Sequence, residues 1–502
     1  MKVKRLTAVG RTVGLLILFS GFPWSVKVVS ADAQLAGYTQ SIVSAEQNSA
    51  RNICPSQLPE AIDAIVDRPE YRRLHWGILI QTLPPSRTLY SRNAQQYFIP
   101  ASNVKLFTTA AALLQLGSDF RIRTSVYGKD GVLRLVGRGD PSLTDAQLRD
   151  LAQQLRRQGI RQIHQLIVQD GYFQASSLHP SWEWEDLYAD YAAPVNSLIL
   201  NQNVMQLQLS PQELGQPVKI TWNDAFAAWQ WQIQNQTLTA ASGVKSGFEV
   251  NGILGKPSLQ IRGQIAVDSA PEVLSVPVRD PGKHFLQHFK LALTQEGITV
   301  ANFQLINSIE KVSEPELAFV ESPPLFQLLA DTNQPSNNIY AEALLRTLGV
   351  KNSLGGNQDS ATLGLNSIKT SLANLGVDDE SFILADGSGL SRRSLVSPAS
   401  VVQTLQAISQ SPQERFYRIS LPVAGVSGTL RNRFKDTPAL GIVSAKTGTL
   451  TGVVTLSGYV DAPNYERLVF SIMVNQSDQP ASVMRKTIDE IVLLLTYLSA
   501  CK

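Results

Sequence analysis

The feature that most constrains the fold of this 502-residue chain is that its pattern of apolar residues changes along its length, from helix-like to strand-like and back. Segments with helical periodicity lie towards both ends, whereas residues from about 125 to 275 are short β-like runs separated by Gly, Pro and Asn turns. A chain of this length exceeds one compact core, so we expect an interrupted domain and an insertion. The predicted division is 34–125 with 276–502 for the interrupted domain and 126–275 for a strand-rich inserted domain.

The interrupted domain is predicted to be α+β, with an antiparallel sheet flanked by helices. Three apolar runs at 439–445, 453–460 and 468–474 are joined by tight connections, which is the pattern of neighbouring antiparallel strands. Apolar residues at helical spacing predict the flanking helices, at 104–116, 284–293, 339–348, 361–375 and 483–498.

The first 33 residues have the organisation of an export signal. A basic leader at 2–11 precedes an apolar stretch at 13–24, and residues 31–33 form an A-x-A cleavage site. The stretch is short for a spanning helix, so we expect cleavage and export to the periplasm or cell envelope, with at most peripheral membrane contact. An uncleaved anchor is the alternative.

Net charge does not point to a polyanionic partner. The whole chain has a formal charge of +3, from 44 basic and 41 acidic residues. The leader carries five of the basic and one of the acidic residues, so the remainder holds 39 and 40, a net charge of −1. The predicted mature chain therefore gives no support for nucleic-acid binding.

The two cysteines, Cys54 and Cys501, lie near the two ends of the predicted mature sequence. In an oxidising compartment they could form one disulfide that ties these ends together, and two unpaired thiols are the alternative. Two cysteines alone cannot build a zinc or iron–sulfur centre.

A pair of histidines, His284 and His288, has the four-residue spacing of a metal-binding helix. No Glu completes an H-E-x-x-H pattern, and the adjacent Phe285 and Phe289 indicate the edge of a core-facing helix. The sequence therefore predicts no metal and no cofactor.

The first motif with chemical meaning is Ser102-x-x-Lys105, which precedes a strongly apolar helix. Residues three apart share one face of a helix, so the amine can reach the hydroxyl and act as its base. The same pattern occurs at 242–245 and 308–311, but no apolar helix follows either copy. Context thus selects Ser102, although an ordinary first helical turn is the structural alternative.

Two further motifs follow in the last third of the chain. Ser336-x-Asn338 offers a second hydroxyl and a carboxamide that can bind a substrate amide, although a helix cap would have the same residues. Lys446-Thr447-Gly448-Thr449 ends a strand-like run, where the lysine and threonine can hold a carboxylate and glycine permits close approach of a backbone. The alternative is a sheet edge that lysine protects from aggregation.

The order and spacing of these three motifs resemble those of penicillin-recognising serine acyl-transferases. The chain is similar to class C low-molecular-mass penicillin-binding proteins of the D-alanyl-D-alanine carboxypeptidase/endopeptidase type, peptidase family S13. Further similar segments lie at 139–143, 191–196, 386–391 and 425–430. The family also has a long insertion between its first and second motifs. Asn337 stands where the family often has Asp.

The resemblance implies a penicillin-binding transpeptidase-like, β-lactamase-like catalytic fold and a role for each motif residue. The implied roles are Ser102 as nucleophile, Lys105 as base, Ser336 as proton relay, Asn338 as holder of the substrate amide, Lys446, Thr447 and Gly448 as the carboxylate site, and the amides of Ser102 and Thr449 as oxyanion hole.

The resemblance implies an exported serine hydrolase. Its partners would be peptidoglycan stem peptides that end in D-Ala-D-Ala and β-lactams that inhibit it covalently, and no cofactor is expected. A β-lactamase with the same motifs is one alternative, but no water-activating carboxylate is evident from the sequence and the insertion argues against it. A non-catalytic wall-binding scaffold is the other, and it would not need the intact motifs.

Overall fold

The computed structural model describes residues 52–224, 226–308, 312–352 and 358–501. The leader predicted at 1–33 lies outside these residues. In the part of the chain that is described, no helix combines the length and the apolar character that crossing a membrane requires.

An antiparallel sheet of five strands forms the centre of the interrupted domain, in the order β16-β17-β18-β1-β2. Strands from both ends of the chain meet in it, because β1 pairs along its whole length with β18. The predicted antiparallel sheet is confirmed. Its strands are β1 (His75–Thr82), β2 (Thr88–Arg92), β16 (Val443–Leu450), β17 (Val453–Val460) and β18 (Leu468–Asn475).

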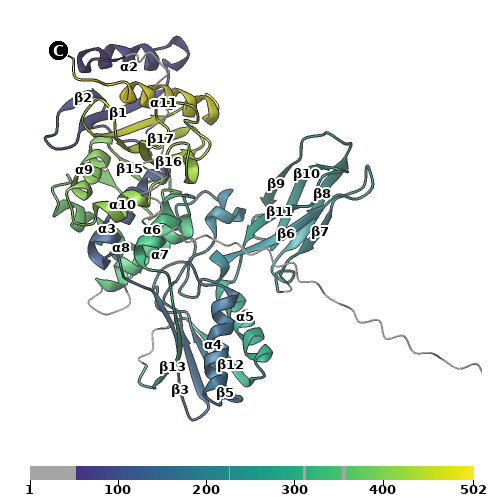
Figure 1. The fold of residues 1–502 in the computed structure, drawn as a ribbon. Helices are drawn as coiled ribbons and strands as arrows, with labels where there is room; N and C mark the ends of the chain where they lie inside the picture. Colours follow the sequence, from purple (N-terminus) through teal and green to yellow (C-terminus); the bar gives the residue numbers. More distant parts are fainter. Residues whose placement is uncertain (1–51, 225, 309–311, 353–357, 502) are drawn as a thin grey trace, which may run out of the picture. The chain divides into compact units, whose positions relative to one another are not determined.

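The two faces of this sheet are buried against separate layers of helices, as alternation along β1 shows. Ile78 and Ile80 lie in the layer that contains α2 (Leu58–Val66) and α11 (Ala481–Thr496), which run beside each other in Figure 1. Leu79 faces the opposite layer. That second layer contains α3 (Val104–Leu116), α6 (Leu325–Asn333), α7 (Asn338–Lys351), α8 (Ser360–Ala373), α9 (Pro398–Ser409), α10 (Glu414–Ile419) and the two-stranded ribbon of β14 (Phe382–Ile383) and β15 (Leu395–Val396).

The insertion contains a mixed sheet of five strands in the order β12-β5-β4-β3-β13, with a core of its own. Helices α4 (Asp145–Arg157) and α5 (Pro281–Gln295) contribute Leu148, Leu151 and Phe285 to that core. The strands are β3 (Arg123–Lys129), β4 (Val132–Val136), β5 (Gln162–Gln169), β12 (Thr299–Ile306) and β13 (Glu316–Glu321).

Two three-stranded sheets without helices share a further core inside the insertion. Their strand orders are β11-β6-β7 and β8-β10-β9, and this strand-only unit is seen in Figure 1. The strands are β6 (Val204–Ser210), β7 (Lys219–Trp222), β8 (Gln232–Ala240), β9 (Gly247–Gly252), β10 (Ser258–Ala266) and β11 (Glu272–Pro277).

The boundary expected at residue 275 needs correction. The helical texture that returns at 276 belongs to α5, which packs in the core of the inserted mixed sheet, and β12 and β13 pair with β5 and β3. Strand pairing therefore extends the insertion to residue 321. Because pairing between distant segments leaves no mark on local periodicity, sequence texture alone could not place this boundary.

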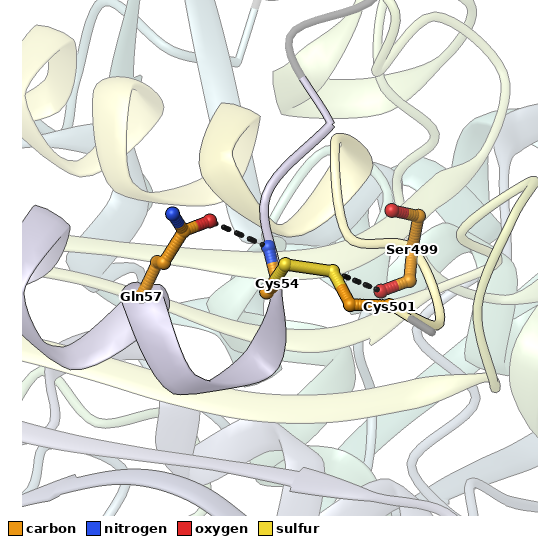
Figure 2. Close-up of a disulfide and its surroundings, with 4 residues drawn as sticks. All are labelled: Cys54, Gln57, Ser499 and Cys501. Carbon is orange, nitrogen blue, oxygen red and sulfur yellow. Dashed lines mark hydrogen bonds between the residues drawn. A yellow bond between two sulfur atoms is a disulfide. The ribbon is translucent and has the colours of Figure 1, made fainter.

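Cys54 and Cys501 form a disulfide across 447 residues of sequence, with their Cα atoms 5.5 Å apart (Figure 2). Backbone hydrogen bonds support the same junction, since Ile53 N donates to the carbonyl of Tyr497 at 2.9 Å and Ser499 N donates to that of Ile53 at 3.1 Å. The bridge joins the segment that leads into α2 to the segment that leaves α11. Of the two alternatives that the sequence left open, the structure has the disulfide.

Replacing both cysteines by serine should lower the free energy of unfolding by about 2–4 kcal/mol, because the unfolded chain loses a constraint on a long loop. Thermal melts of the two proteins measure this loss as a lower Tm. Reductant should lower the Tm of the natural chain to that of the Cys54→Ser/Cys501→Ser variant and leave the variant unchanged. Equal Tm values for the variant and the oxidised natural chain would contradict the prediction.

Candidate active site

Ser102 lies in a tight 3-10 turn, Ala101–Asn103, directly before α3. Ala101 has a φ of 48°, in the left-handed region that residues with a Cβ rarely adopt, so the surrounding structure must hold this turn in place. One helical turn later Lys105 is fully buried, and its Nζ lies 3.0 Å from Oγ of Ser102. The pair that the sequence spacing predicted is therefore in contact.

The Lys105 amine has two further partners, both oxygen atoms. Nζ donates to Oδ1 of Asn338 at 2.6 Å and to the carbonyl of Ser388 at 2.7 Å. Because these two oxygens can only accept, a neutral amine gives them its two hydrogens and keeps its lone pair for the hydroxyl of Ser102. This contact set would direct the lone pair of a neutral Lys105 at one hydroxyl, that of Ser102.

Burial also gives Lys105 the proton affinity of a base at neutral pH. Loss of hydration lowers its pKa from 10.5 to about 7, and the negative charges of Asp386 and Glu342 offset part of that fall. A lysine with this pKa is deprotonated in a substantial fraction of molecules near pH 7.

Ser336 and Lys446 form a second hydroxyl–amine pair. Ser336 follows α6 with a φ of 67°, and its Oγ accepts a hydrogen bond of 2.8 Å from Nζ of Lys446. Lys446 is fully buried on β16 and also donates to the carbonyl of Thr447 at 2.8 Å. Burial and the positive charge of Lys105 lower the pKa of Lys446 well below its usual value, so the two amines disfavour each other's protonation.

The start of α7 places Asn338 beside Lys105. The cap of this helix is Asn337, whose Oδ1 accepts from the backbone N–H groups of Ile339 and Tyr340 at 3.1 and 3.4 Å. Asn338 uses its Oδ1 for Lys105 and donates from Nδ2 to the carbonyl of Tyr191 at 2.8 Å. A carboxamide has four hydrogen-bonding positions, so two remain for a substrate amide.

The edge strand β16 carries the third motif against the turn that holds Ser102. A Cβ on Gly448 would stand 2.2 Å from Oγ1 of Thr455 and 2.9 Å from the carbonyl of Pro100, so only glycine fits there. Thr447 is partly exposed, and its Oγ1 bonds that of Thr429 at 2.8 Å.

The backbone of β16 also directs amide donors away from β17. Ala445 N donates to the carbonyl of Pro422 at 2.9 Å, on the side away from β17. Peptide groups alternate direction along a strand, so the amides of Thr447 and Thr449 face the same outer side. The exposed Thr449 therefore presents an amide at the sheet edge, as an oxyanion site needs.

The other two S-x-x-K copies do not form such a pair in the described residues. Ser242 and Lys245 are exposed in a turn between β8 and β9, and the Ser242 hydroxyl donates to Asp268. Of the third copy, Lys311 lies outside the described residues.

Sequence reasoning missed the role of the loop at 386–391, although it noted the segment. Asp386 accepts hydrogen bonds from Nε1 of Trp182 at 3.0 Å and from the N–H groups of Gly389 and Ser391, both at 2.8 Å. These bonds fix the loop so that the Ser388 carbonyl faces Lys105. An Asp followed by alternating Gly and Ser was the available signal, since it is typical of a tight side-chain-to-backbone turn.

Comparison with known proteins decides the family. Residues 58–497 match the D-Ala-D-Ala carboxypeptidase 3 (S13) family. The chain belongs to this family. The resemblance that the motifs suggested is confirmed, and with it a serine hydrolase of the carboxypeptidase type.

Individual relatives match this chain over most of their own length. A D-alanyl-D-alanine carboxypeptidase of an Actinomadura species is 33% identical over 449 residues, covering 85% of this chain and 82% of the relative. Penicillin-sensitive carboxypeptidase A of Dictyostelium discoideum is 30% identical over 460 residues, covering 84% and 87%. The crystal structure of penicillin-binding protein 4 (dacB) from Haemophilus influenzae has a TM-score of 0.74 at 26% identity, covering 86% of this chain and 98% of that one.

The rate at which a fluorescent penicillin labels the protein should rise with pH through an apparent pKa of about 7. With Lys105 in the predicted role of base, labelling would need the neutral amine, whose fraction falls about tenfold per pH unit below its pKa. Stopped-time labelling from pH 5 to 9, with Ser102→Ala as the unlabelled control, measures the profile. A rate that stays flat across pH 6–8 would show that Lys105 does not control acylation.

Proposed function

We propose that the protein is a D-Ala-D-Ala carboxypeptidase and endopeptidase that acts on peptidoglycan stem peptides through an acyl-enzyme at Ser102. The observation that carries this proposal is the buried amine of Lys105, 3.0 Å from Oγ of Ser102 and with its pKa lowered to about 7. Burying an amine without a carboxylate partner costs stability, which a non-catalytic scaffold would have no reason to retain.

The acylation step follows from these contacts. Lys105 takes the proton of Ser102 as Oγ attacks the carbonyl carbon of the penultimate D-Ala, and the amides of Ser102 and Thr449 stabilise the oxyanion. The C–N bond then breaks, and the leaving amine receives a proton from the hydroxyl of Ser336. Because Lys446 Nζ donates to Ser336 Oγ, that hydroxyl keeps its own hydrogen for this transfer. The proton that Lys105 took from Ser102 then passes through Nζ of Lys446 to Oγ of Ser336, so no charge is left over. Water later hydrolyses the ester, which releases the peptide as a carboxylic acid and restores the hydroxyl of Ser102.

Substrate binding would use the amine of Lys446 and the hydroxyl of Thr447 at the sheet edge. Lys446 and the hydroxyl of Thr447 would hold the terminal carboxylate of the peptide beside β16, and Gly448 lets that strand pack directly against the turn that holds Ser102. Asn338 would hold the substrate amide with the two hydrogen-bonding positions that Lys105 and Tyr191 leave free. A β-lactam presents a carboxylate and an acyl carbonyl of the same kind, so it would acylate the same serine.

Export fits this substrate. The leader pattern at 1–33 and the disulfide between Cys54 and Cys501 both indicate an oxidising compartment outside the cytoplasm, where peptidoglycan lies.

Replacing Lys105 by alanine should slow labelling with fluorescent penicillin by about 10²–10⁴-fold, since the general base is lost. Lys245→Ala is the matched control, because it removes a lysine at the same position of an S-x-x-K pattern, and its rate should stay within about twofold. Equal losses in the two variants would contradict the assignment of the base. Rapid release of the label from the natural chain would indicate a β-lactamase, and no labelling at all a scaffold.

The Thr447→Val variant should hydrolyse a peptide ending in D-Ala-D-Ala about tenfold less efficiently, which corresponds to the loss of about one hydrogen bond to a charged group. Measured kcat/KM for the same peptide with an amidated C-terminus should not change, because that peptide has no carboxylate to hold. Thr451→Val, in the exposed turn after β16, is the control. A loss of equal size on both peptides would show that Thr447 does not bind the carboxylate.

Crosslinked and uncrosslinked muropeptides in the same assay separate endopeptidase from carboxypeptidase action.

A further inference from the structure

A second cluster of reactive side chains lies in the insertion, away from the motifs of the active site. Helix α5 carries His284 and His288 one turn apart, with only 1% and 9% of their surfaces exposed. Their ring centroids are 4.3 Å apart and the ring planes are tilted by 52° to each other. Asp224, in the loop between β7 and β8, reaches the same point from the strand-only unit.

The three side chains converge on one small volume. Oδ2 of Asp224 lies 3.1 Å from Nε2 of His288 and 3.8 Å from Nδ1 of His284. One ligand atom from each residue lies within 4.8 Å of the other two. Zinc bonds of about 2.0–2.1 Å at tetrahedral angles separate neighbouring ligand atoms by about 3.4 Å, between the two distances observed. A metal ion would therefore require only small side-chain movements.

The partners of Asp224 and His284 leave one candidate ligand atom of each residue without a hydrogen. Oδ1 of Asp224 accepts from Phe226 N at 2.8 Å, so Oδ2 is the oxygen that faces the histidines. The Gln230 carboxamide has its oxygen fixed by Arg279 N at 2.8 Å, so its NH₂ group faces Nδ1 of His284 at 3.4 Å. That contact leaves Nδ1 without a hydrogen, so a metal ion would replace this long contact and take the lone pair that Gln230 now faces.

A carboxylate outside the trio orients His288. Oδ1 of Asp145 lies 2.7 Å from Nδ1 of His288, and its Oδ2 accepts from Nδ2 of Asn201 at 2.8 Å. When the neutral ring carries its hydrogen on Nδ1 and donates it to Asp145, the lone pair of Nε2 is directed at Asp224. A carboxylate that holds the far nitrogen of a ligating histidine is a recurrent feature of protein zinc sites.

The cluster also borders open space. Asp224, His284 and His288 line a cavity of about 660 Å³ whose wall includes Asn201 and Phe226. Three protein ligands beside a cavity leave room for water or a small anion in the remaining coordination position.

We propose that Asp224, His284 and His288 bind one divalent transition-metal ion of the Zn²⁺ class, with Asp145 as the positioning residue for His288. The ion would join α5 of the mixed-sheet unit to the β7–β8 loop of the strand-only unit. This reverses the expectation of no metal from the histidine spacing, because the third ligand lies 64 residues from His288 and no local pattern marks it.

The alternative is that the cluster is a metal-free ion pair, with a protonated His288 between two carboxylates. Only the proposed metal site predicts stoichiometric metal binding; the ion pair predicts none. Titration of the chelator-treated full chain with Co²⁺ should give the strong visible absorption of a four- or five-coordinate ion at one equivalent, and Zn²⁺ should displace it.

Variants separate this site from adventitious binding. His284→Ala and Asp224→Asn should abolish the Co²⁺ band, and Asp145→Asn should weaken the affinity by about 10–100-fold at unchanged stoichiometry. His164→Ala, an exposed histidine on β5, is the control and should bind as the natural chain does. Labelling by fluorescent penicillin, which uses none of these residues, confirms that each variant is folded. Absence of a stoichiometric band, or a band that survives both His284→Ala and Asp224→Asn, would overturn the proposal.

Discussion

The candidate active site depends on keeping the amine of Lys105 buried without giving it a carboxylate partner. The carboxylates of Asp386 and Glu342 are close enough to affect its pKa, but each accepts its hydrogen bonds from groups other than Lys105. Asp386 accepts from Trp182 and from backbone N–H groups of its own loop, and Glu342 accepts from Arg346 at 2.8 Å and from Gly387 N at 2.8 Å. The hydrogen bonds of Lys105 go instead to oxygens of a hydroxyl, a carboxamide and a peptide group. An ion pair would hold the lysine charged, whereas these partners let desolvation lower its pKa.

Two glycines let the rest of the fold approach the strained turn around Ser102. Gly448 on β16 has no room for a Cβ beside the carbonyl of Pro100, and on the other loop a Cβ at Gly389 would stand 1.9 Å from the carbonyl of Ala101. The turn is thus enclosed between the sheet edge and the 386–391 loop. Close packing on both sides explains how Ala101 keeps a left-handed conformation that the residue itself disfavours.

The sequence made some of this predictable and hid the rest for a physical reason. Ser102 and Lys105 are one helical turn apart, so local spacing was sufficient to place them together, and the strand pattern around Lys446 was equally local. The groups that tune Lys105 are its contacts with Asn338 and Ser388 and the charges of Asp386 and Glu342, and tertiary packing sets their distances from the amine. The same holds for β12 and β13, which pair with strands more than a hundred residues earlier, and for Asp224, which has no local signal. Periodicity reports which face of an element is buried and not what it is buried against.

The turn at 201–203 shows how the insertion takes part in building the active site. Three successive residues, Asn201, Gln202 and Asn203, have φ values of 49°, 59° and 52°, each of which costs a residue with a Cβ about 1–2 kcal/mol. Hydrogen bonds on several sides offset that cost. Asn203 donates to the carbonyl of Pro194 at 2.8 Å, and Asn201 donates to Asp145, which holds His288. Between them, Gln202 accepts from Asn337 at 2.6 Å, the cap of the helix that begins with Asn338. One strained turn therefore contacts both the histidine cluster and the helix start beside Lys105, which ties the geometry of the insertion to that of the site.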